Sequence, residues 1–461
     1  MRSDERAGGA PTPYIPNTDS DRAAMLDALG LESADDLFAG LARRHRDPEI
    51  SLPEALPELE LRRLFEGIAA QNGAAGRPSF LGAGAYRRFV PAVVPVLANR
   101  REFVTAYTPY QAEISQGTLQ SAFEYQSTVC ELTGMEVSNT GLYDVASATA
   151  EACLLAARVT RRGAVLFREP VHPHTLDVAR TYALGSGLEV ESAGPDASPS
   201  EHHACLAVQQ PDFLGRIVDL EAAAREAHAA GALLLVIADP FALGMLRSPG
   251  DAGADIVAGE GRDLAGPLNF GGPSLGIFAT LGKHVRQVPG RIVGRTQELQ
   301  GPSLPDGGRG DPRTGYVLTL QAREQFIRRE RATSNFSTGQ ALVALAFTLA
   351  VQALGPHGLR EAAELCYQTA HDAARRIAAL PGYEVVETGP WFQEFLVRAP
   401  LPPTALREHL AERGITGGLP VAGRPEPECV NSTLFCVTET TPPEHIDALV
   451  EALAEAGEGG S

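Results

Sequence analysis

The central part of the chain, from about residue 115 to residue 280, alternates between helical and strand patterns. Helical periodicity of apolar residues marks four segments: 118–134, 147–158, 174–185 and 219–231. Short runs typical of strands lie at 163–167, 188–193, 205–209, 232–238, 255–259 and 274–280. Strands that alternate with helices of about 10 to 15 residues need crossover connections, which produce a parallel sheet covered by helices on both faces. The pattern therefore predicts an α/β domain with a largely parallel sheet.

The flanking regions predict an N-terminal arm and a smaller C-terminal domain. Residues 1–65 form the expected arm, with one helix over Asp19–Leu29 that begins after Asn17 or Thr18 and ends at Gly30. Residues 66–340 would hold the large domain. Residues 341–461 would form a small α/β domain that opens with an apolar helix and continues with a helix, two strands and a helix at 358–380, 383–387, 394–399 and 442–456.

One segment of the large domain has no regular pattern. Residues 297–314 are rich in glycine and proline and lack a hydrophobic period. A segment of this kind is either a mobile functional loop or a disordered one, and we favour the functional loop.

The charge balance and the cysteines limit the classes of partner. The chain has 57 acidic and 39 basic side chains, for a formal net charge of −18, whereas nucleic-acid backbones are bound by lysine and arginine. The longest apolar stretch, residues 341–354, is shorter than the roughly 20 residues of a membrane span, and the N-terminal residues contain no apolar leader. The six cysteines have no spacing typical of metal sites. We therefore expect a cytoplasmic protein that binds neither nucleic acid nor membrane nor metal.

Lysine is almost absent from the chain, and Lys283 is the only one. A cofactor held as a Schiff base needs a lysine amine, so any such role would fall on this residue. Lys283 stands beside Gly282, His284 and Arg286. This setting favours an exposed turn over a cofactor site.

Polar residues near predicted strand ends are candidates for ligand binding, because ligands of open parallel sheets bind at the carboxyl ends of the strands. Asp239 directly follows the strand at 232–238 and would either pair with a protonated pyridine nitrogen or form a turn before Pro240. His172 follows the strand at 163–167 and would stack on a planar cofactor, cap the next helix or lie in solvent. Asp144, with Ser147 and Thr149, stands at a predicted helix start, where it would either help to bind an anion or act only as an N-cap.

The densest group of polar and aromatic side chains precedes the helix at 118–134. It consists of Tyr107, Thr108, Tyr110, Gln111, Glu113, Ser115 and Gln116. Binding groups concentrate on loops that a rigid scaffold holds, so this segment is the strongest site candidate from the residues alone. A second candidate is a predicted basic helix with Arg323, Arg328, Arg329 and Arg331, which would hold a carboxylate or form a solvated face.

Several segments resemble the glycine cleavage system P-protein family. The resemblance is to the N-terminal subunit of the two-chain form of that protein. The most specific is TAYTPYQAEISQGTLQ at 105–120. Others are FLGAGAYRRFVPAVV at 80–94, GADIVAGEG at 253–261, FGGPSLGIFAT at 270–280 and YVLTLQAREQFIRRERATSN at 316–335. The resemblance runs in order from about residue 14 to residue 340 and continues more weakly to residue 439.

This resemblance implies a pyridoxal-phosphate-dependent fold of type I, similar to aspartate aminotransferase. It implies that a homologous second subunit binds the pyridoxal phosphate on its own lysine, opposite Arg262 of this chain. Asp144, His172, Asp239 and Arg262 would then be remnants of a cofactor site. Active-site residues facing the second subunit would be Tyr107, Thr108, Tyr110, Gln111, Glu113, Ser115, Gln116 and Gly117.

The resemblance also implies an activity and an assembly. The complex would decarboxylate glycine and transfer the aminomethyl group to the lipoyl arm of H-protein, with two copies of each subunit in an α2β2 tetramer. The sequence departs from the family pattern in several places: Ala112 for Pro, Val145 for Gly, Ser147 for Thr, Phe326 for His, Arg331 for Lys, and Phe336 with Ser337 for Ile with Cys. Two alternatives stay open, namely a diverged paralogue that acts on another amino acid and a noncatalytic scaffold subunit.

Overall fold

The computed structural model describes residues 16–46, 51–74, 76–105, 107–302, 308–386 and 389–458. Contacts divide the chain into two units, Met1–Gly73 and Ala74–Ser461. In the first unit, α1 (Asp19–Leu29) is capped by Thr18 and ends at Gly30, whose φ is 67°. These are the predicted bounds. The unit also holds α2 (Glu58–Ala70) and two 3-10 turns at Ala34–Phe38 and Arg43–His45.

The second unit is built on a seven-stranded sheet in the order β1-β7-β6-β5-β4-β2-β3. The strands are β1 (Val137–Ser138), β2 (Ala164–Arg168), β3 (Glu189–Ala193), β4 (His203–Gln210), β5 (Leu233–Ala238), β6 (Ile256–Glu260) and β7 (Gly276–Thr280). The five neighbouring strands from β6 to β3 in this order pair in parallel, whereas β7 pairs antiparallel with both β6 and β1. The prediction of a largely parallel α/β sheet is confirmed.

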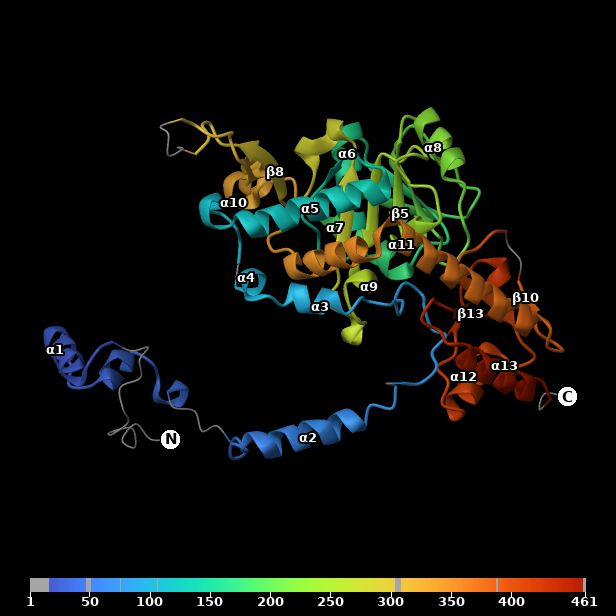
Figure 1. Cartoon of the computed structure of the whole chain (residues 1–461), viewed down its shortest axis with the longest axis horizontal. Helices are drawn as coiled ribbons and strands as arrows, with labels where there is room; N and C mark the ends of the chain where they lie inside the picture. Colours follow the sequence, from blue (N-terminus) through green and yellow to red (C-terminus); the bar gives the residue numbers. More distant parts are fainter. Residues whose placement is uncertain are drawn as a thin grey trace. The chain divides into compact units, whose positions relative to one another are not determined.

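Helices cover both faces of this sheet (Figure 1). Alternate residues of β5 point to opposite faces, so Leu234 and Val236 enter one core and Leu235 and Ile237 the other. The first core is closed by α5 (Gln116–Thr133), α8 (Leu220–Ala229) and the start of α11 (Ala341–Ala378). The second core is closed by α6 (Val145–Thr160) and α7 (Pro173–Ser186).

The C-terminal part forms a four-stranded sheet in the order β10-β11-β13-β12. Its strands are β10 (Glu384–Val385), β11 (Glu394–Arg398), β12 (Leu419–Pro420) and β13 (Ser432–Cys436), covered by α12 (Pro403–Glu412) and α13 (Pro443–Glu458). The long helix α11 joins both parts, because Phe347 packs in the large core and Ala370 in the small one. The division at residues 65 and 340 stays a prediction.

Three predicted helices differ from expectation, and the alternatives for the loop at 297–314 stay a prediction. The apolar helix and the helix at 358–380 are one element, α11, interrupted at Gly355, where φ is 64° before Pro356. The basic helix is short: α10 spans Gln325–Arg328, and Arg329 has a φ of 53°, which no α-helix accommodates. The segment 297–314 connects β8 (Ile292–Gln297) to β9 (Thr314–Thr319), which pair in an antiparallel hairpin, and residues 303–307 lie outside the described residues.

Three short helices remain. α9 (Arg262–Ala265) directly follows β6, α3 (Val93–Ala98) packs through Val94 against Ala346 and Ala350 of α11, and α4 (Arg101–Val104) follows α3 in the chain. By length and composition, α11 is the one helix among the described residues that could cross a bilayer, but buried core helices of soluble proteins meet the same criterion. Its Ala344 and Phe347 lie in the core of the large domain.

Candidate functional site

The carboxyl ends of the parallel strands are covered by the chain's own segment Gly82–Arg88. Main-chain or side-chain atoms of this segment bond to three of the predicted cofactor-site residues, namely Asp239, His172 and Arg262. The sequence resemblance includes this segment, within residues 80–94, but implies no role for it. Its glycines at positions 82 and 84 were the one signal of a close backbone approach.

Asp239 is held by Arg88. One guanidinium nitrogen, Nη2, lies 3.4 Å from Oδ2 of Asp239, and Nη1 lies 3.0 Å from Oε2 of Glu439. The Arg88 side chain is fully buried, and its guanidinium centre lies 3.7 Å above the ring centroid of Phe241. Oδ1 of Asp239 accepts the N–H of Phe241, which is the predicted turn role. Arg88 is thus the ion-pair partner of the carboxylate that would otherwise face a protonated pyridine nitrogen.

His172 caps α7 and contacts the covering segment. Its Nδ1 accepts the N–H of His174, so the neutral ring carries its proton on Nε2 and donates it to the carbonyl of Ala83 at 3.1 Å. Burial lowers the pKa of His172, and the neighbouring His174 lowers it further, which favours this neutral form. The capping alternative for His172 is confirmed.

Arg262 starts α9 and faces the same segment. Its Nε donates to Oδ1 of Asp263 at 2.9 Å, and its Nη2 donates to the carbonyl of Gly84. The other oxygen of Asp263 accepts the N–H of Tyr86 at 3.1 Å. Arg262 and Asp263 therefore fix the middle of the segment on the large domain.

Glu394 of β11 fixes the segment on the small domain. Its Oε1 accepts the N–H of Ala83 at 2.6 Å, and its Oε2 accepts the hydroxyl of Tyr86 at 2.7 Å. Burial raises the pKa of Glu394 to about 7, although both hydrogen bonds favour the charged form. The sequence does not predict this buried carboxyl group, because nothing in EFLVRA distinguishes Glu394 from an exposed residue at the start of a strand.

The start of α6 carries two carboxyl groups. Asp144 is the N-cap, and its Oδ1 accepts the N–H of Ser147 at 2.7 Å. Oε2 of Glu260 accepts the N–H of Val145 at 3.3 Å, and burial raises the pKa of Glu260 to about 7. Thr149 bonds back to the carbonyl of Val145. The N-cap alternative for Asp144 is confirmed, and the helix N-terminus is satisfied by the chain's own carboxyl groups.

These contacts test whether pyridoxal phosphate fits this chain. The cofactor needs a lysine, a carboxylate for its ring nitrogen and free N–H donors for its phosphate. Position 262 is arginine, Asp239 is held by Arg88, and a phosphate at α6 would meet Asp144 and Glu260. The chain's own cofactor position therefore does not fit pyridoxal phosphate.

Lys283 does not supply the missing amine. It lies in a 3-10 turn after β7, and because β7 runs antiparallel to β6, this turn is at the sheet edge opposite Asp239. Its side chain is 60% exposed, with Nζ 3.6 Å from Oδ1 of Asp255. The predicted exposed turn is confirmed.

The segment Tyr107–Gly117 lies on the surface. Tyr107 is 86% exposed, and Tyr110 is 54% exposed, with its hydroxyl accepting a hydrogen bond of 3.3 Å from Arg291. Gln116 has a structural role, since its side-chain amide bonds to both main-chain groups of Tyr316 in β9 at 2.8 and 2.9 Å. Thr108 and Ser115 are half-buried; the exposed residues are Gln111, Glu113 and Gly117.

Among the described residues, no hydrogen bond joins the segment 107–117 to Asp239, His172 or Arg262. Of the arginines predicted to form a basic face, Arg323 is instead structural, because its guanidinium donates to the carbonyls of Val288 and Gly290.

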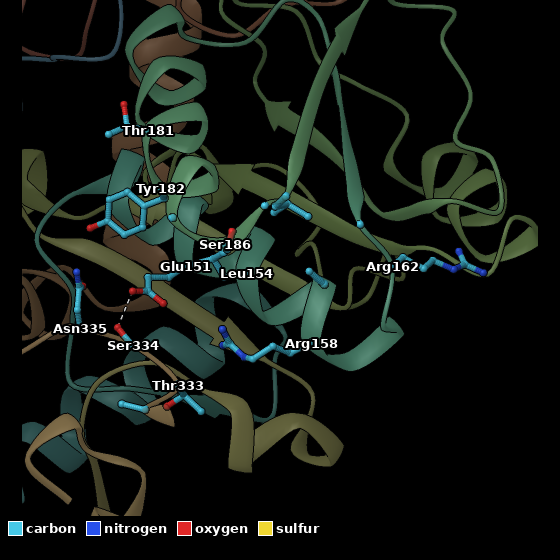
Figure 2. A pocket seen from close by; sticks show the side chains of 16 residues that line it. Glu151, Leu154, Arg158, Arg162, Thr181, Tyr182, Ser186, Thr333, Ser334 and Asn335 are labelled. Carbon is cyan, nitrogen blue, oxygen red and sulfur yellow. Dashed lines mark hydrogen bonds between the residues drawn. The ribbon is translucent and has the colours of Figure 1, made fainter. Parts of the chain in front are cut away.

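A cleft of about 740 Å³ lies between α6, α7 and residues 332–335 (Figure 2), and none of the predicted site residues lines it. Oε1 of the buried Glu151 accepts the hydroxyl of Ser334 at 2.5 Å. Within the described part of the chain, Oε2 of Glu151 and Nε of Arg158 have no hydrogen-bond partner. Burial raises the pKa of Glu151 and lowers that of Arg158. Both residues line the cleft.

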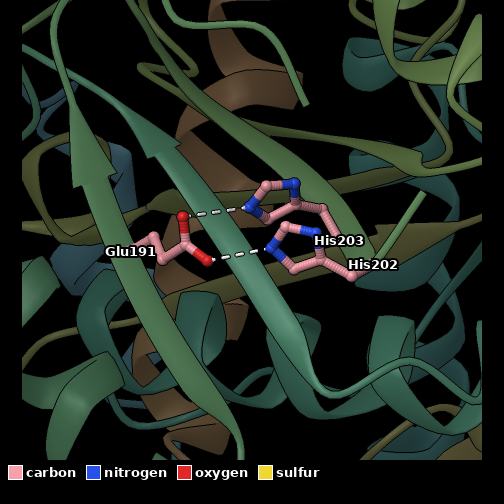
Figure 3. A group of neighbouring side chains, drawn as sticks. All are labelled: Glu191, His202 and His203. Atoms are coloured by element: carbon pink, nitrogen blue, oxygen red, sulfur yellow. Dashed lines mark hydrogen bonds and ion pairs between the residues drawn. The ribbon is translucent and has the colours of Figure 1, made fainter. Parts of the chain in front are cut away.

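Glu191, His202 and His203 cluster beside the edge strand β3 (Figure 3). The two imidazole Nε2 atoms lie 3.1 and 3.2 Å from the two oxygens of Glu191. The N–H of Ser200 donates to Nδ1 of His203, so the neutral ring keeps its proton on Nε2, the atom that a metal would need. His202 is hydrogen-bonded to Glu191, whereas Nε2 of the buried His203 lies within ion-pair distance of Glu191 and has no hydrogen-bond partner among the described residues.

Comparison with known proteins places this geometry in a family. The family model described as "Glycine cleavage system P-protein" matches residues 12–453. A relative from Thermomicrobium roseum, "Probable glycine dehydrogenase (decarboxylating) subunit 1", is 47% identical and covers 96% of this chain and 99% of its own length. A relative of the same description from Rhodospirillum rubrum is 45% identical, with the same shares covered.

Solved structures agree with this placement. One described as glycine decarboxylase (P-protein) of the glycine cleavage system, in inhibitor-bound form, has a TM-score of 0.85 and 42% identity, and it covers 96% of this chain and 100% of that one. A sphingosine-1-phosphate lyase from Burkholderia pseudomallei, at 16% identity, a TM-score of 0.60 and 91% and 94% coverage, shares the fold alone. The predicted type I fold of pyridoxal-phosphate-dependent enzymes is confirmed. The chain belongs to the glycine cleavage system P-protein family.

Proposed function

We propose that this chain is one of two different subunits of a glycine decarboxylase and that the second subunit binds the pyridoxal phosphate. The observation that carries the proposal is the closed cofactor position: Arg88 holds Asp239, and the only lysine lies at the opposite edge of the sheet. A chain with this fold and without its own cofactor position depends on another chain for pyridoxal phosphate. Relatives of nearly full length that are named as subunit 1 of the enzyme support the same conclusion.

The surface around α3 and α4 supports a protein partner. Large apolar side chains are exposed there, at 43% to 86% of their area, in Phe89, Val93, Val96, Val104, Tyr107 and Ile114. Exposed apolar patches of this kind mark protein interfaces. Tyr107 and Tyr110 lie in the same stretch of the chain, so a partner that covers the patch would bring its own active site to these hydroxyl groups.

In the proposed reaction, glycine loses its carboxylate as CO2, and the aminomethyl carbon forms a bond to one sulfur of the oxidised lipoyl arm of H-protein. The S–S bond of the lipoyl disulfide breaks in this step, and the second sulfur leaves as a thiol. Pyridoxal phosphate on the second subunit supplies the electron sink for decarboxylation. This chain would supply the wall of the site: the hydroxyl groups of Tyr107, Tyr110 and Thr108 to orient substrate, and Glu113 to accept hydrogen bonds. Arg291 holds the Tyr110 hydroxyl, and Gln116 anchors the segment on β9.

The assembly and the location belong to the same proposal. We place the complex in the cytoplasm as an α2β2 tetramer. The six cysteines are free, as is usual in a reducing compartment. Of the two alternatives from the sequence, neither the diverged paralogue nor the noncatalytic scaffold is favoured, because the similar relatives carry the glycine dehydrogenase name.

The proposal is tested by reconstitution. The chain is coexpressed with its lysine-bearing homologue, and exchange of the glycine carboxyl group with labelled bicarbonate is measured with lipoylated H-protein. We expect exchange only when both chains are present, and no visible Schiff-base absorbance from this chain alone. Absorbance in the isolated chain that Lys283→Ala removes would contradict the proposal. Sedimentation velocity of the complex tests the tetramer, and cell fractionation tests the location.

A further inference from the structure

We propose that the segment Gly82–Arg88 is a built-in occupant of the cofactor position, in which Arg88 replaces the cation of a pyridine ring and ties the large domain to the small one. The missing lysine is then only half of the reason why this subunit holds no cofactor. The inference rests on the proposed function in one respect, the assignment of pyridoxal phosphate to the second subunit.

The contacts of Arg88 carry the first step. Its guanidinium bonds to Asp239 at the end of β5, in the large domain, and to two residues of the small domain: Gln393 at 2.6 Å and Glu439 at 3.0 Å. Oδ2 of Asp239 also accepts the side-chain amide of Gln393 at 3.2 Å. The arginine therefore fills one buried position between the domains and satisfies groups from both.

The shape of the segment carries the second step. Ala83 and Gly84 have φ values of 55° and 89°, so the main chain turns sharply between two rigid elements. A Cβ at Gly82 would lie 2.5 Å from Cβ of Cys436, and one at Gly84 would lie 3.0 Å from Cδ2 of His172. The segment is thus fitted closely against residues of both domains and does not lie over them as a loose loop.

The cost of opening carries the third step. A molecule that took this position would leave Asp239 and Glu439 without the guanidinium, and removal of one partner from a buried ion pair is strongly unfavourable. A phosphate group would also meet the carboxyl groups of Asp144 and Glu260. A lysine at position 262 therefore cannot bind pyridoxal phosphate unless the segment first leaves.

The test uses the full chain in complex with the second subunit, with pyridoxal phosphate as the probe. Borohydride reduction traps a Schiff base as pyridoxyl-lysine, and peptide mass spectrometry assigns it to a chain. Three variants are compared: Arg262→Lys alone, Arg262→Lys combined with Arg88→Met, and Arg262→Lys combined with Arg87→Met. The third is the matched control, because Arg87 is the exposed neighbour of Arg88. Apparent affinity scales with the fraction of molecules whose site is open, so we expect at least about fivefold more label at position 262 with Arg88→Met than in the other two.

Two results would overturn the inference. One is full labelling at position 262 with Arg262→Lys alone. The other is that Arg88→Met adds no label at position 262 and also leaves amide hydrogen exchange unchanged. The inference requires Arg88→Met to raise amide hydrogen exchange in residues 82–90 and 391–396, and Arg87→Met to leave it unchanged. Label on the second subunit's own lysine reports the proposed function separately, since its absence would contradict that assignment whatever happens at position 262.

Discussion

The hydroxyl of Tyr86, which is half-buried, donates a hydrogen bond of 2.7 Å to Oε2 of the buried Glu394. Burial raises the pKa of Glu394 from 4.5 to about 7, so the folded protein binds a proton there that the unfolded chain has already lost. The free energy of unfolding must therefore fall as pH rises from about 4.5 to about 7, at up to about 1.4 kcal/mol per pH unit from this group.

Glu394→Gln should remove this contribution. The glutamine carbonyl still accepts the N–H of Ala83, and the Tyr86 hydroxyl can turn to accept from the new amide. Urea unfolding at pH 5 and pH 8 should show a smaller loss of stability in Glu394→Gln than in the wild type. Glu444→Gln, at an exposed position of α13, is the control and should follow the wild-type curve. Equal pH dependence in all three proteins would contradict the raised pKa.

Gly84 should be hard to replace for two separable reasons. Its φ of 89° strains any residue with a Cβ, and that Cβ would also press on His172 at 3.0 Å. Gly414→Ala is the matched control, because Gly414 has a φ of 74° with no atom within 4 Å of the added Cβ. We expect each alanine to cost about 1 kcal/mol or more from strain, and Gly84→Ala to cost measurably more than Gly414→Ala in chemical denaturation. Equal costs would show that the segment yields freely at His172.

Much of the fold follows from local patterns, whereas the covering of the cofactor position does not. The sequence predicts α1 from the capping residues Thr18 and Gly30. It also predicts all seven helices and strands from β2 to β6, because capping and apolar periodicity are local signals. Arg88 and Glu439 form a buried ion pair across 351 positions of the chain, which no periodicity reports. Both are charged residues in segments that read as surface, and only the fold shows that each offsets the other's burial.

Gln116 shows the same limit within the predicted site. Its place among hydroxyl and amide groups favours a binding role. In the structure, however, its side-chain amide bonds to the main-chain N–H and carbonyl of Tyr316, as a neighbouring strand would. Residues that bind substrate and residues that anchor a loop have the same side chains, so composition cannot separate them. The exposed fraction does separate them, and it singles out Tyr107.

Tyr107 should matter to activity and not to the stability of the chain. Its side chain is 86% exposed, so Tyr107→Ala removes little packing within this subunit. We expect the free energy of unfolding of the isolated chain to change by less than about 0.5 kcal/mol. Carboxyl exchange by the reconstituted complex should fall at least about tenfold, which corresponds to about 1.4 kcal/mol of lost transition-state stabilisation.

The control for Tyr107 is Leu184→Ala on α7, because Leu184 is also 86% exposed. It should leave both stability and exchange unchanged. Normal exchange with Tyr107→Ala would remove this residue from the proposed wall, and an equal loss in both variants would point to a general defect in assembly.

Phe270 should be an anchor for the second subunit. Its side chain is fully exposed in this chain, and its φ of 55° holds the ring outward on the turn between α9 and β7. Aromatic residues of this kind dominate binding energy when a partner covers them. Phe270→Asn removes the ring and suits the left-handed backbone, so the isolated chain should fold as before. The dissociation constant of the complex should rise about tenfold or more by sedimentation equilibrium, whereas Leu184→Asn should leave it unchanged. An unchanged constant for Phe270→Asn would place the interface elsewhere on the chain.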